Sequence, residues 1–284
     1  MEVAQKTYIC CFWKTYNMKE IIVRAVSVVL YISIVIVTLF TSHKWFISLF
    51  LILGFITINE LLRLINFKNI LPYLFMIILI YFFSYKKIDI GIVYILLFCT
   101  LIVNLILLKD LFTRSKKSYS IIIKFIILVF YLISGFIFLT LIPYKNGSFD
   151  PKIIFGVFVL IWANDTFAYM VGKSIGKRKL FPRISPKKTI EGFLGGLLGT
   201  IIISFIIFKY TSLFSFGVWI AIAIIVSIFG TLGDLIQSKF KRNAGVKDSG
   251  VMMPGHGGLY DRLDSIIYTC PFVFSFLEIV EYVS

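Results

Sequence analysis

Long uninterrupted apolar runs are the feature of this sequence that most restricts its fold. Nine of them lie at about residues 21–40, 45–62, 70–85, 88–108, 120–142, 152–172, 191–208, 213–234 and 263–282. A helix needs roughly 20 mostly apolar residues to cross a bilayer. Backbone polar groups in hydrocarbon must be paired internally, and the runs lack the alternation of a β-barrel. The sequence therefore predicts an all-α, polytopic integral membrane helical bundle with about nine transmembrane helices.

The composition supports a membrane protein over a soluble one. Of the 284 residues, 59% are hydrophobic and only 15% are charged, whereas soluble domains are about a quarter charged. The four Cys residues are scattered without metal-ligand spacing. The net charge of +15 fits membrane topology signals or binding of anionic lipid or nucleotide. We expect no nucleic-acid partner.

The distribution of the 29 Lys and Arg residues predicts how the chain is oriented. Nine spans put the termini on opposite sides, and 21 of these cations fall on the side of the N-terminus against 6 on the other. Cytoplasmic segments collect Lys and Arg. We therefore predict a cytoplasmic N-terminus and an active site on the cytoplasmic face. The compact chain, without a long soluble extension, favours a bacterial inner (plasma) membrane.

The chain divides into two regions by the position of its polar residues. Residues 1–150 are predicted to form about five N-terminal transmembrane helices with little chemistry. Residues 151–284 are predicted to form the catalytic region, with cytoplasmic loops 173–190 and 235–262. In the first region, Glu60 and Arg63 have the spacing of a structural i, i+3 pair near a helix end.

The first polar group is the sequence WANDTFAY, residues 162–169, within the sixth predicted span. It places Asp165 inside an apolar helix, where a carboxylate is costly and usually marks a functional site. A buried Asp–Lys pair is the alternative explanation. We favour a functional role for Asp165.

The second polar group is a loop with seven Lys or Arg between residues 172 and 192. A cytoplasmic loop collects such residues in any case. Here, however, Ser185, Lys187 and Lys188 immediately precede a predicted helix. Free N–H groups and the positive end of the helix dipole make such a terminus suited to binding phosphate.

The third polar group lies between the last two predicted spans. If the eighth helix continues, Asp234, Ser238 and Lys241 share one of its faces, and Asp261 and Asp264 share a face of the ninth. Helix capping, topology signals and a glycine turn could each explain one part. A loop of nearly thirty residues is usually functional or disordered, however. Carboxylates among cations suit Mg²⁺ bound together with phosphate oxygens. These residues predict a membrane enzyme acting on a phosphate ester.

Three motifs resemble those of the phosphatidate cytidylyltransferases, also called CDP-diacylglycerol synthases. The longest is S-K-F-K-R-x4-K-D-S-G-x2-M-P-G-H-G-G-L-Y-D-R-L-D, residues 238–264. WxxDxxAY at 162–169 and SPKKTxEG at 185–192 precede it in the expected order. The resemblance covers roughly the C-terminal half. It implies a nucleotidyltransferase of phospholipid biosynthesis that converts CTP and phosphatidic acid into CDP-diacylglycerol and pyrophosphate with Mg²⁺.

The resemblance also implies residue roles. It assigns the metal site to Asp234, Asp261 and Asp264, with Mg²⁺ and room for a second cation such as K⁺. The catalytic positions that it adds to Asp234 and Asp261 are Ser238, Lys241, Arg242, Lys247, Asp248, His256 and Arg262. The substrate-binding positions are Asp165, Ser185, Lys187, Lys188, Gly257 and Gly258. His256 is expected to hydrogen-bond rather than act as a base, because a phosphatidate phosphate is already anionic near neutral pH.

Two other functions stay open at this point. An anionic-lipid or ion-coupled transporter would also carry intramembrane carboxylates, but it predicts inverted repeats and polar residues near mid-span. A CTP-dependent polyprenol kinase would use the same nucleotide. A CDP-alcohol phosphatidyltransferase is excluded because the sequence has no Asp-Gly dipeptide. The partners expected are CTP, phosphatidic acid and membrane lipid, and a homodimer is left open.

Overall fold

The computed structural model describes residues 18–86, 89–113, 119–145, 147–252 and 257–283. In these ranges nine helical segments follow the nine predicted runs. The first five are α2 (Met18–Thr41), α3 (His43–Leu64), α4 (Leu71–Ile80) with the π-helical turn η1 (Tyr81–Tyr85), α5 (Ile90–Phe112), and a rod of α6 (Ile121–Ile127), η2 (Leu128–Ile133) and α7 (Ser134–Leu141). The last four are α8 (Pro151–Ile175), α9 (Ile190–Thr211), α10 (Phe216–Asn243) and α11 (Tyr260–Val283).

Two short antiparallel hairpins interrupt the helices. One pairs β1 (Tyr144–Lys145) with β2 (Ser148–Phe149), and the other pairs β3 (Lys179–Phe181) with β4 (Ser185–Thr189). Seven of the described helical segments are long and apolar enough to span a membrane, and two more are shorter and apolar. The predicted all-α, polytopic integral membrane fold is confirmed. The orientation of the N-terminus stays a prediction.

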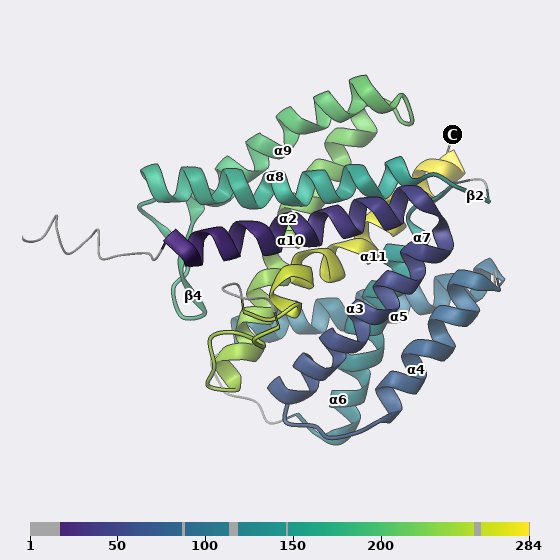
Figure 1. The fold of residues 1–284 in the computed structure, drawn as a ribbon, viewed down its shortest axis with the longest axis horizontal. Helices are drawn as coiled ribbons and strands as arrows, with labels where there is room; N and C mark the ends of the chain where they lie inside the picture. The colour runs from purple at the N-terminus through teal and green to yellow at the C-terminus, as the bar shows by residue number, and fades with distance from the viewer. Residues whose placement is uncertain (1–17, 87–88, 114–118, 146, 253–256, 284) are drawn as a thin grey trace, which may run out of the picture.

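The polar connections gather at one end of the bundle. Figure 1 shows β4 and the segment between α10 and α11 at the left, near the start of α2, whereas β2 and the C-terminus lie at the right. The loops predicted to share one face of the membrane therefore do lie at the same end. The loop predicted at 235–262 is shorter than expected, because α10 continues to Asn243 and α11 starts at Tyr260.

Phe240 explains why α10 continues beyond its apolar run. It is buried and packs its ring against Tyr119, just before the fifth span, and Tyr131, within it, at centroid distances of 6.2 and 6.1 Å. Helices in proteins are stabilised mainly by such tertiary packing. The helix ends where Gly245 adopts a left-handed backbone with φ of 75°, the usual conformation after a helix C-terminus.

Glycines let α8 and α9 approach closely. A Cβ placed on Gly196 would lie 2.6 Å from the side-chain oxygen of Asn164, and one on Gly199 would overlap the ring of Phe167. Small residues at this spacing allow helix backbones to touch in a membrane. The seam holds Asn164 in place, where its side chain accepts a hydrogen bond from Ser227 of α10 at 2.9 Å.

A buried ion pair joins the N-terminal helices to α10. Lys239 Nζ lies 2.6 Å from Asp110 Oδ2 of α5, and the two side chains are only 8% and 7% exposed. Lys239 also donates to the backbone oxygen of Asp110. Arg183, from the β3–β4 hairpin, donates to the carbonyls of Leu111 and Thr113 at 2.9 and 2.8 Å. The C-terminal end of α5 thereby fixes both α10 and the hairpin.

Removing one member of this pair should destabilise the protein strongly. Lys239→Met removes the ammonium group from its contact with the buried Asp110 carboxylate, and breaking such a buried pair typically costs about 3–5 kcal/mol. We expect a markedly lower midpoint of thermal unfolding in detergent. Lys209→Met is the control, because Lys209 is exposed and lies over the Phe205 ring. Equal midpoints for the two variants would contradict a stabilising role.

Candidate functional site

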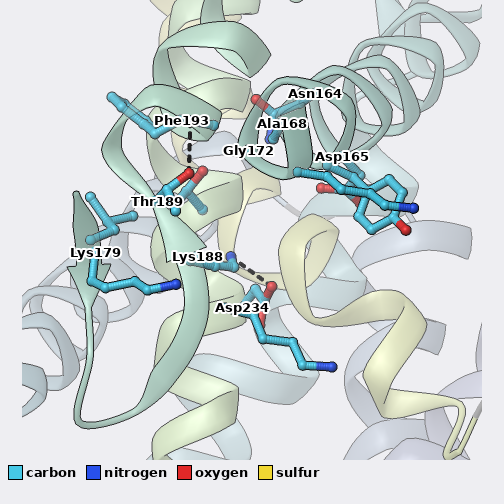
Figure 2. A pocket seen from close by; sticks show the side chains of 15 residues that line it. Asn164, Asp165, Ala168, Gly172, Lys179, Lys188, Thr189, Phe193 and Asp234 are labelled. Atoms are coloured by element: carbon cyan, nitrogen blue, oxygen red, sulfur yellow. Dashed lines mark hydrogen bonds and ion pairs between the residues drawn. The ribbon is translucent and has the colours of Figure 1, made fainter. Parts of the chain in front are cut away.

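A cavity of about 530 Å³ lies between α8, α9, α10 and the β3–β4 hairpin (Figure 2). Its volume is within the range of small-molecule sites. Charged side chains dominate its polar lining: Asp165, Lys173, Lys179, Lys187, Lys188 and Asp234. Four of these six are residues that the sequence analysis assigned to substrate or metal. Lys173 and Lys179 are added by the structure.

Lys188 and Asp234 form the ion pair at the base of this cavity. Lys188 Nζ lies 2.6 Å from Asp234 Oδ2, as the dashed line in Figure 2 marks. The other oxygen, Oδ1, accepts a hydrogen bond from Ser238 at 3.1 Å. The predicted face of Asp234, Ser238 and Lys241 is therefore present on α10. The ion pair joins that face to β4.

The pKa of Lys188 reflects its two surroundings. Burial by itself would lower this pKa, but the attraction and hydrogen bond of Asp234 raise it above its ordinary value of 10.5. A lysine with a raised folded-state pKa contributes its full charge-dependent stability below the unfolded pKa of about 10.4, and loses it only as the pH rises through the folded value. Lys188 is therefore a cation across the physiological range.

Three carboxylates surround the Lys188 ammonium group. Asp234 contacts it, and Asp165 and Asp264 lie near enough to attract it electrostatically. The same three carboxylates repel one another. They come from α8, α10 and α11. One cation in the structure thus offsets negative charge from three helices.

Asp261 is the centre of a second cluster beside the cavity. Its Oδ1 accepts hydrogen bonds from Lys241 and Gln237, both at 2.7 Å. Its Oδ2 accepts two more at 3.0 Å, from the N–H groups of Ser249 and Gly258, and lies 3.0 Å from the Ser249 hydroxyl oxygen. Lys241 also attracts the carboxylate of Asp234. The two clusters therefore form one continuous row of alternating charges.

The other predicted positions lie on the β3–β4 hairpin, on α10 and α11, and in the loop between these two helices. Arg242 donates to the carbonyls of Ile184 and Val246 at 3.3 and 3.0 Å, so it connects α10 to the β3–β4 hairpin and to the loop that follows α10. Arg262 lies close enough to attract the Asp165 carboxylate. Further positions are Ser185 on β4, the exposed Lys247 and Asp248, and Gly257, whose φ is 87°. His256 lies outside the described residues.

The oxygen ligands of this site suit a hard metal ion. Among the described residues, no group of three His, Cys, Asp or Glu side chains could hold a metal ion by itself. Mg²⁺, however, typically binds one or two carboxylates and completes its coordination with waters and substrate phosphates. Asp264 fits that requirement, and Asp234 fits it if Lys188 moves away from Oδ2. Asp261 fits it only if Lys241 moves away from Oδ1. The metal assignment of these three residues stays a prediction.

The structure adds one carboxylate that the sequence analysis assigned a different role. Glu60, in α3, is only 4% exposed and accepts hydrogen bonds from Ser249, Leu259 and Tyr260 rather than pairing with Arg63. The expectation of a Glu60–Arg63 pair was wrong. The signal was present in the sequence, because a carboxylate within an apolar span usually has a functional partner.

Similarity to known proteins agrees with this site. The model of a family described as "Cytidylyltransferase family" matches residues 22–280, which include all nine helices to within a few residues of their ends. The chain belongs to the cytidylyltransferase family. It is therefore a nucleotidyltransferase, and the resemblance inferred from its three motifs is confirmed.

Two curated relatives carry the same name. A phosphatidate cytidylyltransferase of Staphylococcus aureus (strain COL) is 42% identical over 183 residues, which are 60% of this chain and 68% of the relative. That of Staphylococcus haemolyticus (strain JCSC1435) is 46% identical over 130 residues, 45% of this chain and 50% of the relative. Both relatives are bacterial. The seven long apolar helices indicate an integral membrane protein.

The loop geometry predicts that Gly258 cannot be replaced. A Cβ there would overlap Ser249 Oγ and Glu60 Oε2 and would lie 2.7 Å from the backbone nitrogen of Gly250. We expect Gly258→Ala to reduce activity at least about tenfold, because Asp261 would lose the hydrogen bonds that orient it. Gly217→Ala is the control, since its Cβ would meet nothing closer than 4.0 Å. Equal activity of the two variants would disprove the packing argument.

Proposed function

We propose that this protein transfers the cytidylyl group of CTP to phosphatidic acid, giving CDP-diacylglycerol and pyrophosphate, in phospholipid biosynthesis. The observation that supports it most is the cavity where four lysines meet Asp165 and Asp234, in a chain of the cytidylyltransferase family. Its curated relatives are named for phosphatidate. An anionic phosphate lipid and a nucleoside triphosphate both need cations in such a site.

The four cavity lysines would bind the phosphates of the two substrates. Lys187 and Lys188 lie on β4, Lys179 on β3 and Lys173 on α8, so they approach the cavity from different elements. Phosphoryl and nucleotidyl transfer depend mainly on positioning and on electrostatic stabilisation of charge. Lysines held on a hairpin and a helix can supply both. Asp234 keeps Lys188 oriented before substrate binds.

The chemical step joins two phosphates without a proton transfer. A phosphatidate oxygen attacks the α-phosphorus of CTP and forms a new P–O bond. The bond from the α-phosphorus to the oxygen that bridges to the β-phosphorus breaks, and pyrophosphate leaves with that oxygen and the bonding electrons. The attacking oxygen is already anionic near neutral pH. The side chains therefore have to bring two anions together and do not need to deprotonate either.

Mg²⁺ is part of the proposal, with room for a second cation such as K⁺. Asp234, Asp264 and Asp261 would hold it together with the triphosphate. When bound, the ion would neutralise charge that develops on the leaving pyrophosphate. Ser238, Lys241 and Arg242 lie along the same helix as Asp234. They are suited to contact the phosphates next to it.

We also propose that the site faces the cytoplasm of a bacterial inner membrane. CTP is a cytoplasmic nucleotide, and the bundle end with β4 and the 244–259 loop is the one enriched in Lys and Arg. The exposed Tyr169 of α8 lines the cavity. Met170, also on α8, and Leu194 on α9 are exposed as well. Lipid acyl chains could therefore lie along α8 and α9 while the headgroup reaches the lysines.

The reaction predicts lipid-dependent release of pyrophosphate. Purified protein in detergent with CTP and Mg²⁺ should release pyrophosphate only when phosphatidate is added. Asp234→Asn should reduce that rate at least about 100-fold, because it removes charge from the centre of the site. Asp89→Asn is the control, because Asp89 caps α5 through the Gly91 N–H group and Asn caps equally well.

Three results would contradict the proposal. Full activity of Asp234→Asn would exclude that residue from the site. Consumption of CTP with a polyprenol but not with phosphatidate would indicate the kinase. Lipid transport across vesicle membranes without pyrophosphate release would indicate a transporter.

A further inference from the structure

The buried Glu60 carboxylate binds three residues that are distant from it in the sequence. Its Oε2 accepts hydrogen bonds from the Ser249 hydroxyl at 2.6 Å and from the Tyr260 N–H group at 2.9 Å. Its Oε1 accepts from the Leu259 N–H group at 3.0 Å. These partners are 189 to 200 residues away in sequence. A carboxylate removed from water is stable only when such donors replace its hydration.

The two N–H groups are the ones that α11 leaves unpaired. α11 begins at Tyr260, and the first N–H groups of a helix have no partner within it. Glu60 supplies that partner from α3. Its negative charge is also favourable at a helix N-terminus. Glu60 therefore caps α11 in place of a residue adjacent in sequence.

Ser249 connects this cap to the proposed site. Its hydroxyl lies 2.6 Å from Glu60 Oε2 and 3.0 Å from Asp261 Oδ2. Asp261 in turn holds Lys241 at 2.7 Å. The order of contacts is therefore Glu60, Ser249, Asp261 and Lys241. A displacement of Glu60 would reach the charged row in two contacts.

The loop is shaped around the Glu60 carboxylate. A Cβ on Gly250 would lie 2.5 Å from Oε1, and one on Gly258 would overlap Oε2. Two glycines of the signature thus leave space for the same side chain. Glycine permits this close approach at an entropic cost to folding. The loop conformation depends on a carboxylate at this position.

We propose that Glu60, from the N-terminal half of the chain, is a positioning residue for cytidylyl transfer. It fixes the start of α11 and, through Ser249, the direction of the Asp261 carboxylate. This inference rests on the proposed function, in which Asp261 and Lys241 contact the phosphates. Glu60 itself contacts no substrate. Its effect is transmitted through the loop.

Kinetics of the full-length protein test this role. Glu60→Gln keeps the shape but has one acceptor oxygen, so one N–H group of α11 loses its partner. Ser249→Ala removes the hydroxyl that lies between Glu60 and Asp261 but keeps the Ser249 N–H group that binds Asp261. It serves where Glu60→Gln folds poorly. We expect both variants to raise KM for CTP about tenfold, as loss of a supporting partner does. The double variant should be no worse than the more impaired single variant, because both interrupt one path.

KM separates positioning from folding, because it does not depend on the fraction of folded enzyme. Glu278→Gln is the control: this carboxylate is on the same helix, α11, and accepts from the Tyr94 hydroxyl at 2.8 Å. It should keep the wild-type KM. An unchanged KM in Glu60→Gln and Ser249→Ala would overturn the inference.

Hydrogen–deuterium exchange decides the inference without any activity. In Glu60→Gln, the Leu259 or the Tyr260 amide should exchange at least about tenfold faster than in wild type, because one of these two N–H groups loses its acceptor. Glu278→Gln should leave it unchanged. Unaltered exchange in Glu60→Gln would overturn the role of Glu60. A wild-type protein that releases no pyrophosphate would count against the proposed reaction instead.

Discussion

Two lysine–aspartate contacts hold this site together. Lys188 contacts Asp234, and Lys241 contacts Asp261. In a low-dielectric surrounding a lone carboxylate is costly, whereas a paired one can be retained. The pairs tie β4 to α10 and α10 to α11. Because each lysine also attracts the neighbouring carboxylate, the row behaves as one electrostatic unit into which a polyphosphate and its cation could enter.

The N-terminal helices take part in holding that row. Asp110 of α5 fixes Lys239, which lies two residues from Lys241 on α10. Glu60 of α3 fixes the loop that leads into α11. Both contacts are buried and involve charge, so they are specific in geometry. The catalytic motifs lie in the C-terminal half, but their arrangement depends on side chains from both halves.

Local features of the sequence predicted most of the fold. Hydropathy placed nine helices because each apolar run forms a helical segment, seven of which are long enough for a bilayer. The end of α10 could not be placed in the same way, since polar residues follow Gly233 and the stabilising contact of Phe240 is with distant tyrosines. The β3–β4 hairpin has no apolar alternation, so nothing in its sequence distinguished it from a loop.

The site was predicted in its residue types more than in its contacts. The motifs brought Asp165, Lys188 and Asp234 to one cavity as expected. The partner of each carboxylate, however, is set by the tertiary fold. Glu60 shows this limit clearly, because its nearest cation in sequence is Arg63 but its observed partners are about two hundred residues away.

The glycine seam between α8 and α9 limits how the cavity can change shape. Because the Asn164 and Phe167 side chains fill the space that Gly196 and Gly199 leave open, the two helices interlock closely and have little room to slide past each other. These helices therefore form a rigid wall. The hairpin of β3 and β4 is joined to that wall through short connections at both ends. Widening of the entrance for a bulky nucleotide would have to come from bending of the hairpin at those connections.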